Sequence, residues 1–172
     1  KKRTAEGRYE PNGGVWVECD CNLVSGESLI RQILYGKQFM RDEFGVESRC
    51  LWLPDVFGNS WILPQILKKS GVDHFITSKI SWNDVNRMPY DTFAWRGIDG
   101  TEVTTHLNRM HLIPDINNLN GAVGEIRDKH SNDSRLVAYG YGDGGGGPTY
   151  GMLEYMKRVR DLDGMPTIEP TT

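Results

Sequence analysis

The sequence contains no long apolar run and no excess of positive charge. No stretch approaches the roughly 20 apolar residues that a membrane-spanning helix needs, and no apolar core of a signal peptide is present. We therefore expect no membrane partner, and the sequence offers no route to secretion. The formal net charge is −3, with acidic and basic residues interspersed, which argues against a nucleic-acid partner.

Cysteine and histidine are also scarce, with three and four residues. An odd number of cysteines does not suggest a disulfide framework, and Cys19 and Cys21 lack the second pair or nearby histidine of a zinc finger. Reduced cysteines in a chain without a signal peptide favour a cytoplasmic protein. The histidines form no His-x-Asp or His-x-x-x-His pair, so surface or core positions are favoured over metal binding for all four. They are His74, His106, His111 and His130.

Length and composition indicate a folded globular chain. The 172 residues are enough to bury roughly 68–70% of the surface that the unfolded chain exposes. Contents of 38% hydrophobic and 25% charged residues are typical of globular proteins. The first residue is not methionine and lies in a charged stretch, and the last residues do not mark the end of a helix or strand. We therefore expect a single partial domain over residues 1–172, cut from a larger one.

Apolar periodicity predicts alternating strands and helices. One helix begins after the N-cap Ser25 and ends at Gly45, and another begins after Thr149 and runs to about Arg160. Further helices are expected at 64–69 and, more weakly, at 116–130. A turn at 97–100 would join two of the strands as a hairpin. This alternation indicates an α/β fold with a largely parallel sheet and flanking helices. The expected strands are 14–18, 50–53, 74–77, 92–96, 102–107 and 136–139.

Three aspartates, Asp20, Asp55 and Asp143, each follow the carboxyl end of an expected strand. In parallel α/β folds, ligands and catalytic groups gather at that edge of the sheet. Glycosidases need two carboxyl groups across the scissile bond, and aromatic faces pack on sugar rings. Aspartates in loops more often form caps and turns, so position alone favours that role. The neighbouring aromatic residues are Trp16, Trp52, Phe57, Trp82, Tyr90 and Trp95.

A glycine-rich run at 142–147 follows the last expected strand and contains Asp143. Such a loop can hold phosphate with its N–H groups, but no Lys-Ser or Lys-Thr pair follows it. We favour a loop whose backbone passes close to a ligand and which presents Asp143 on an adaptable segment.

Several sequence blocks, in the same order, resemble glycoside hydrolase family 38 in its cytosolic-type and bacterial branch. The most distinctive block is Trp52-Leu53-Pro54-Asp55-Val56-Phe57-Gly58. The resemblance implies a distorted parallel β/α barrel and a zinc-dependent, retaining exo-α-mannosidase that releases terminal α-mannose from oligosaccharides. The blocks are 15–22 with 25–28, 51–58 with 63–67, 79–83, 95–100 with His106, and 140–148.

The resemblance also implies roles for particular residues. Asp55 matches an aspartate that is both nucleophile and zinc ligand, Asp143 matches the general acid/base, and Asp20 matches an aspartate of the sugar pocket. The family's other zinc ligands, a His-x-Asp pair and a later histidine, are not in this chain. One of four protein ligands would be present, so we assign none of the four histidines to zinc. Further pocket residues implied by the resemblance are Trp82, Trp95 and Arg96.

We expect the chain alone to lack zinc-dependent mannosidase activity. Missing barrel strands would leave open sheet edges, which favour association into a homo-oligomer. Two alternatives to an enzyme remain open. The first is a non-catalytic carbohydrate-binding α/β module, which would use the same aromatic and carboxylate side chains to bind an α-mannoside oligosaccharide. The second is a structural or interaction fragment whose aspartates only cap loops.

Overall fold

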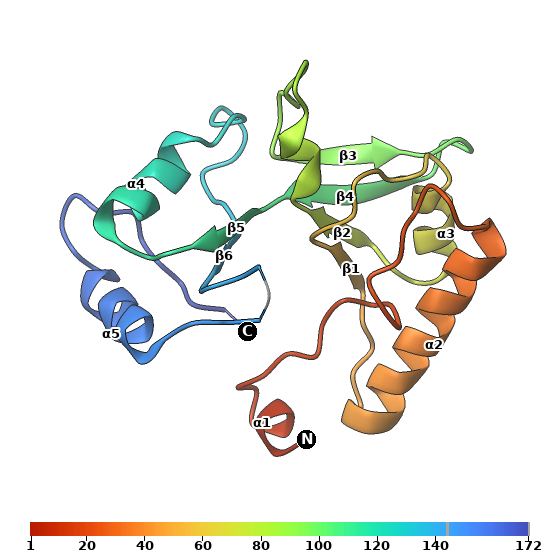
Figure 1. Ribbon diagram of the computed structural model, residues 1–172, viewed down its shortest axis with the longest axis horizontal. Helices are drawn as coiled ribbons and strands as arrows, with labels where there is room; N and C mark the ends of the chain where they lie inside the picture. The colour runs from red at the N-terminus through yellow and green to blue at the C-terminus, as the bar shows by residue number, and fades with distance from the viewer. Residues whose placement is uncertain (144, 172) are drawn as a thin grey trace. The chain divides into compact units, whose positions relative to one another are not determined.

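The computed structural model describes residues 1–143 and 145–171, drawn in Figure 1. These residues form two units, each with its own sheet. The first unit consists of Lys1–Met88 and Thr92–Leu107, and the second of Pro89–Asp91 and Asn108–Thr171. The single partial domain over residues 1–172 stays a prediction.

The sheet of the first unit has the strand order β1-β2-β4-β3. Strands β1 (Cys50–Leu53), β2 (His74–Thr77) and β4 (Glu102–Leu107) run parallel, so their carboxyl ends lie at one edge. Strand β3 (Thr92–Arg96) is antiparallel to β4, because the predicted hairpin turn joins them. All four strands and the mostly parallel sheet are therefore confirmed, whereas closure into a distorted barrel stays a prediction.

Helix α2 (Gly26–Phe44) begins and ends where the sequence predicts. The side chain of Ser25 accepts a hydrogen bond from the backbone N–H of Ser28, and Gly45 ends the helix with a left-handed φ of 70°. Helix α3 (Leu63–Lys69) has a proline in its first turn and contacts both α2 and β4. The helices and strands share one core, whose fully buried members include Ile33, Leu51, Leu53, Leu63, Leu67 and Phe75.

Residues 14–18 do not form the predicted strand. The backbone N–H of Trp16 donates to the carbonyl oxygen of Gln32 at 3.0 Å, so this segment is bonded to α2. Gly36 permits the close approach, because a Cβ there would lie 2.3 Å from the carbonyl carbon of Val15. Contact with the helix outweighs the β propensity of the segment, which depends strongly on context.

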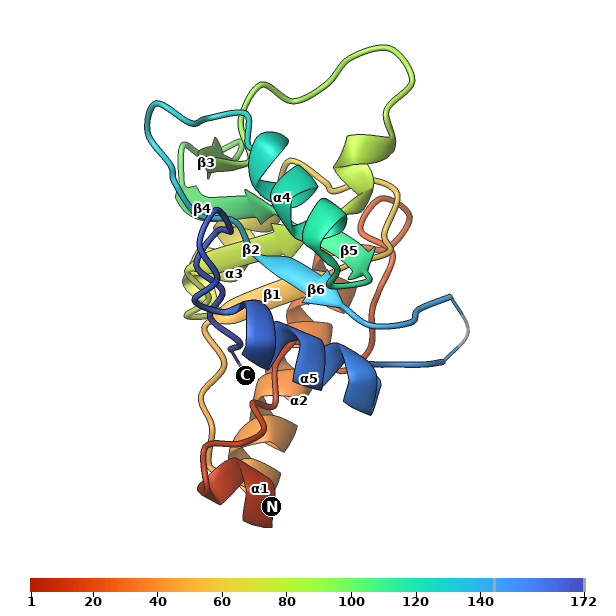
Figure 2. The same cartoon turned by 90° about the vertical axis from the view of Figure 1, so that its left-hand side faces the viewer.

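The second unit contains a parallel pair of strands, β5 (Arg109–Leu112) and β6 (Val137–Tyr139). Figure 2 shows this pair with α4 (Ile116–Gly124) and α5 (Tyr150–Val159). Strand β6 and the helix that follows Thr149 confirm the predictions, whereas β5 was not predicted and has an irregular register. Helices and strands meet in a core that includes Leu112, Leu119, Val137, Tyr139 and Val159.

Helix α4 is shorter than the predicted helix over 116–130. It begins after the N-cap Asp115 and ends at Gly124, where the low helix propensity of glycine favours termination. Beyond it, the backbone N–H of Arg127 donates to Oδ2 of the buried Asp91 at 2.9 Å. A buried carboxylate thus bonds to this segment, which forms turns and a bend rather than a helix.

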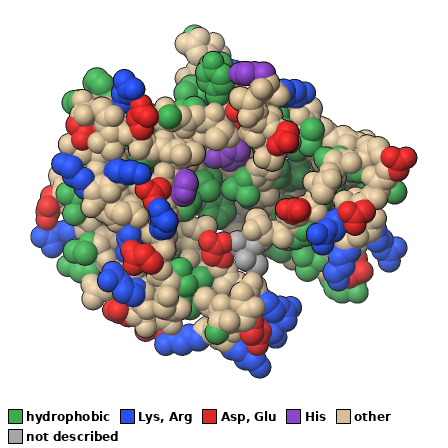
Figure 3. All heavy atoms as spheres, turned by 180° about the vertical axis from the view of Figure 1, so that it is seen from behind, with side chains coloured by type: hydrophobic (Ala, Val, Ile, Leu, Met, Phe, Trp, Pro, Cys, Tyr) green, Lys and Arg blue, Asp and Glu red, His purple; other side chains and the backbone are tan. Residues whose placement is uncertain are grey.

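Helix α1 (Lys2–Ala5) and the 3-10 helix η1 (Lys79–Trp82) are short. None of the helices within 1–143 and 145–171 has the length and apolar character that crossing a bilayer requires. Figure 3 shows acidic and basic side chains interspersed over the face that it draws.

Candidate functional site

Asp55 lies at the carboxyl edge of the first unit's sheet, where the sequence predicts it. It follows β1 by two residues, and 68% of its side chain is exposed. Its Oδ1 lies 2.8 Å from Nζ of Lys79, and its backbone N–H donates to Oε1 of Glu18. The hydroxyl of Ser78 donates to the carbonyl oxygen of Pro54. Contacts from two other segments therefore fix the loop that carries Asp55.

The ammonium group of Lys79 lies near two aromatic rings as well as Asp55. Its Nζ is 4.3 Å from the ring centroid of Trp82 and 5.0 Å from that of Phe57. Only 16% of the Lys79 side chain is exposed, whereas Trp82 and Phe57 are 69% and 71% exposed. Trp82 and Asp55 therefore both contact Lys79, and the exposed rings of Trp82 and Phe57 lie beside the ion pair.

Asp20 lies in a turn and does not follow a strand, which corrects the prediction from the sequence. Its Oδ1 accepts hydrogen bonds from the backbone N–H groups of Asn22 and Leu23, at 2.7 and 2.8 Å. The turn adjoins the Asp55 loop, because a Cβ on Gly58 would lie 2.0 Å from Nδ2 of Asn22. Asp20 therefore has the turn-forming role of a loop aspartate and also lies in a segment next to Asp55.

Trp95 and Arg96 are not brought to Asp55. The ring of Trp95 packs on Phe75 in the core, with centroids 5.4 Å apart. Arg96 pairs with Glu102, the first residue of β4, at 2.7 Å. Both residues thus lie toward the amino ends of the parallel strands, at the opposite edge from Asp55, and their sugar-binding roles stay predictions.

Asp143 belongs to the second unit and follows β6 on the glycine-rich loop, of which Gly144 lies outside the described residues. Its side chain is 91% exposed, and its Oδ1 lies 3.7 Å from Nδ1 of His111. Both residues have left-handed backbones, with φ of 53° and 58°. Gly142 lies against the His111 ring, since a Cβ there would be 2.4 Å from a ring carbon. The separation of Asp143 from Asp55 stays a prediction, because the two residues belong to different units.

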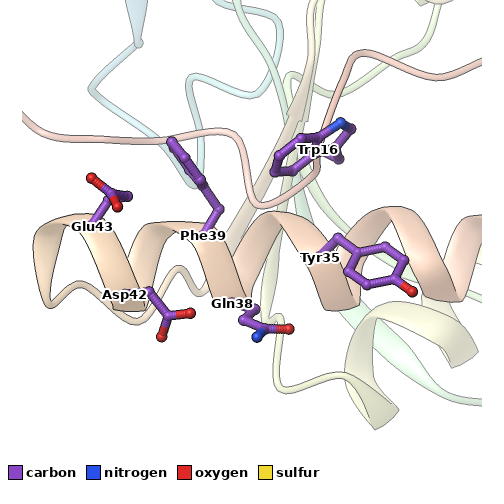
Figure 4. Close-up of a pocket in the computed structure, with 6 residues that line it drawn as sticks. All are labelled: Trp16, Tyr35, Gln38, Phe39, Asp42 and Glu43. Atoms are coloured by element: carbon purple, nitrogen blue, oxygen red, sulfur yellow. The ribbon is translucent and has the colours of Figure 1, made fainter.

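Trp16, expected among the aromatic residues of the site, packs against α2 from the segment that precedes it. Its ring meets that of Phe39 edge to face, with centroids 5.6 Å apart. Figure 4 shows the segment of Trp16 passing over α2, where the two residues line a hollow of about 490 Å³ together with other side chains of the helix. The remaining lining residues are Tyr35, Gln38, Asp42 and Glu43.

The three cysteines are free thiols. A hydrogen bond from the Cys21 thiol lowers the pKa of Cys19 to about 7, and the same pairing raises the pKa of Cys21. Burial raises the pKa of Cys50 to about 11. Cys19 is therefore the cysteine with the greatest thiolate fraction near neutral pH, and it adjoins Asp20 in the chain.

The zinc ion that the resemblance implies needs several ligating side chains at one point. Within the part of the chain that the structure describes, no three His, Cys, Asp or Glu side chains form such a group. Asp55 offers one carboxylate, and its charged neighbour is the ammonium group of Lys79. The described residues do not fit a complete zinc site by themselves. Ligands outside this chain stay a prediction.

Lys79 and His111 are site neighbours that the sequence prediction missed. Lys79 follows β2 by two residues, as Asp55 follows β1, and Leu53 pairs with Thr77 in the parallel register. Equal spacing beyond two adjacent parallel strands is the signal that identifies Lys79. No comparable signal exists for His111, because its left-handed backbone in β5 breaks the regular register.

The chain belongs to glycosyl hydrolase family 38. The family model described as "Glycosyl hydrolases family 38 N-terminal domain" matches residues 1–172. This match confirms the resemblance that the sequence blocks indicate.

Proteins similar in sequence to this chain include several α-mannosidases. The chain is 44% identical to "Alpha-mannosidase G" of Dictyostelium discoideum, over 100% of this chain and 16% of that protein. It is 42% identical to "Alpha-mannosidase" of Saccharomyces cerevisiae, over 88% of this chain and 14% of that protein. The chain thus spans only a small part of the length of these curated relatives.

One solved structure supports the fold. An α-mannosidase from Enterococcus faecalis V583 superposes with a TM-score of 0.52, over 62% of this chain and 12% of that chain. At 24% sequence identity, this likeness shows a shared fold and no more.

Proposed function

We propose that this chain is part of the catalytic domain of an α-mannosidase that releases terminal α-mannose from oligosaccharides with retention of configuration. The observation that carries the proposal is the setting of Asp55, an exposed carboxylate at the carboxyl edge of the sheet. It is paired with Lys79 and flanked by exposed aromatic rings. Family membership and the α-mannosidase names of the relatives support the same activity.

The proposed reaction has two displacements at the anomeric carbon. First, a carboxylate oxygen of Asp55 attacks this carbon and forms a mannosyl ester. The glycosidic C–O bond breaks with its electron pair on the leaving oxygen, which takes a proton from Asp143. Asp143 then accepts a proton from water, the water oxygen attacks the anomeric carbon, and the ester bond breaks. This mechanism requires the two carboxyl groups to lie roughly 5–5.5 Å apart.

Sugar binding is proposed for four further residues. Asp20 and Trp82 are supported by the structure, because their segments adjoin that of Asp55. Aromatic surface such as that of Trp82 suits the apolar face of a sugar ring. For Trp95 and Arg96 the role rests on the resemblance alone.

We propose that the intact enzyme holds one zinc ion, with Asp55 as one ligand and the other ligands outside this chain. Such an ion supplies Lewis-acid stabilisation of charge on bound oxygen atoms. The part played by this chain is to hold the Asp55 carboxylate at a fixed place on the sheet edge.

The wider setting is also proposed. Residues 1–172 would form the central part of a catalytic α/β domain whose remaining strands close a distorted barrel. Strands β1 and β3 lie at the two ends of the strand order, and open edges of this kind favour association into a homo-oligomer. A cytoplasmic location is supported by the three free cysteines.

The test uses the full-length protein that contains this chain, with an aryl α-mannoside as substrate. We expect turnover with α-mannose as the first product by proton NMR, and a loss of about 10⁴-fold or more in kcat for Asp55→Asn. Asp73→Asn is the matched control, because Asp73 pairs with Lys68 and Arg49 before β2. It should retain wild-type kcat. β-Mannose as the first product, or an active Asp55→Asn variant, would contradict the proposal.

A carbohydrate-binding module without catalysis is the second candidate, favoured by the exposed rings of Phe57 and Trp82. It predicts that the full-length protein binds mannose-type ligands without turnover. It also predicts that Trp82→Ala and Asp55→Asn each weaken binding, because both side chains would contact the sugar. Calorimetry beside the turnover assay separates the two candidates.

A further inference from the structure

We propose that Lys79 is a positioning residue for the Asp55 nucleophile, a role that rests on the proposed function. Nζ of Lys79 lies 2.8 Å from Oδ1 of Asp55, and the lysine side chain is mostly buried. An exposed ion pair contributes little, because two mobile side chains must be ordered to form it. Here the Lys79 side chain is already held in place by its burial, so the ion pair fixes the rotation of the Asp55 carboxylate.

The fold attaches Lys79 to the same edge as its partner. Leu53 of β1 and Thr77 of β2 are register partners, and the two charged residues each lie two positions further on. The hydroxyl of Ser78 donates to the carbonyl oxygen of Pro54, which links the two loops beyond the strands. Groups supported by rigid elements keep the geometry that a reaction needs. The ammonium and the carboxylate are therefore positioned together.

The two aromatic rings give Lys79 a support that is independent of Asp55. Trp82 and Phe57 attract the ammonium through their ring electrons. When Asp55 becomes an ester, it loses its charge, but the rings still hold the ammonium in place. The cation is then ready beside the carboxylate that ester hydrolysis releases.

This arrangement predicts which step depends most on Lys79. Orientation of the carboxylate assists ester formation, but the cation also stabilises the free carboxylate, which opposes attack. In ester hydrolysis the same cation stabilises the departing carboxylate, so the charge of Lys79 and the orientation that it imposes both accelerate this step. Loss of Lys79 should therefore slow ester hydrolysis more than ester formation.

The experiment uses the full-length protein and an aryl α-mannoside whose good leaving group makes ester hydrolysis rate-limiting. Lys79→Met should lower kcat about 100-fold, and KM should fall because the ester accumulates. Lys79→Arg, which keeps the charge, should restore kcat at least partly. Lys68→Met is the matched control, because it breaks another lysine–aspartate pair of the same unit, with Asp73. It should leave both constants unchanged.

A second variant pair tests whether Lys79 acts through Asp55. In an Asp55→Asn background, Lys79→Met should cause no further loss of kcat. Lys79→Gln serves as the neutral variant if Lys79→Met lowers the melting temperature. Wild-type protein without turnover overturns the proposed function itself. Two results would overturn the role of Lys79 alone while the wild type is active. The first is a kcat within threefold of wild type in both Lys79→Met and Lys79→Gln. The second is a Lys79→Arg variant whose kcat is as low as that of these neutral variants.

Discussion

Asp55 and Asp143 both follow a strand of a parallel pair, yet their surroundings differ. The Asp55 loop is held by Lys79 and Glu18, and its side chain pairs with an immobilised ammonium. Asp143 is 91% exposed on a glycine-rich loop, and its neighbour His111 lies 3.7 Å away. The first carboxylate is fixed by several contacts, whereas the second is almost fully exposed on a glycine-rich loop.

The difference matches the two proposed roles. A nucleophile must keep one position while a bond to carbon forms and later breaks, so fixed contacts favour it. A general acid/base serves a leaving group and then a water molecule, and a loop suits that exchange. His111 and Asp143 also share left-handed backbones, which cost roughly 1–3 kcal/mol each and cluster at functional sites.

The largest effect should come from replacing Asp143, and it should depend on the leaving group of the substrate. Asp143→Asn should lower kcat/KM by about 10²–10⁴-fold for an oligosaccharide, whose leaving oxygen needs a proton. The loss of kcat/KM should be much smaller for an aryl mannoside with an acidic phenol. Steady-state kinetics on both substrates is the measurement. Equal losses for the two substrates would rule out acid catalysis by Asp143.

The next effect concerns glycines inside a helix of each unit. A Cβ on Gly36 of α2 would lie 2.3 Å from backbone atoms of Val15, so Gly36→Ala should destabilise the protein by about 2–3 kcal/mol. Gly121 of α4 has no atom within 4 Å of that position, and Gly121→Ala should stabilise by about 0.5–1 kcal/mol. Urea unfolding of both variants tests this, and equal midpoints would contradict it.

A smaller effect tests whether the Asp55 loop is as tightly held as its contacts indicate. Gly58 has a φ of 142° and adjoins the amide of Asn22. Gly58→Ala should displace the loop and lower kcat about 10-fold. Asn22→Ala in the same background should recover part of the loss by making room. Kinetics on the single and double variants is decisive, since wild-type kcat in Gly58→Ala would show a loop free to adjust.

The smallest effect is the pH response of an aspartate outside the site. Hydrogen bonds from Lys68 and then Arg49 lower the pKa of Asp73 to about 2. Because the folded pKa is depressed, this stabilisation is present above the unfolded pKa of about 3.9 and is lost as pH falls toward about 2. Asp73→Asn should flatten stability against pH in that window, measured by urea midpoints. An unchanged slope would contradict the assignment.

Much of the first unit could be predicted from sequence because its signals are local. Ser25 and Gly45 bound α2 through capping chemistry, and apolar runs mark β1 and β2. The strand predicted at 14–18 was wrong, because a tertiary bond to Gln32 decides its conformation.

The site was predictable to a smaller extent. The position of Asp55 follows from the end of a buried strand, but its ion pair with Lys79 depends on the register of two strands. Arg96 lies at the opposite edge because it ends β3, the antiparallel strand of the predicted hairpin. The contact between His111 and Asp143 depends on backbone conformations that non-glycine residues rarely adopt.

The central claim is that Asp55 forms a covalent bond to the sugar. An activated fluoro-mannosyl fluoride forms such an ester quickly and releases it slowly, so it should label the full-length protein. Peptide mass spectrometry should then find one fluoro-mannosyl group on the peptide that contains Asp55, and no label in Asp55→Asn. A label on another carboxylate, or rapid turnover of the wild type without any label, would contradict the account.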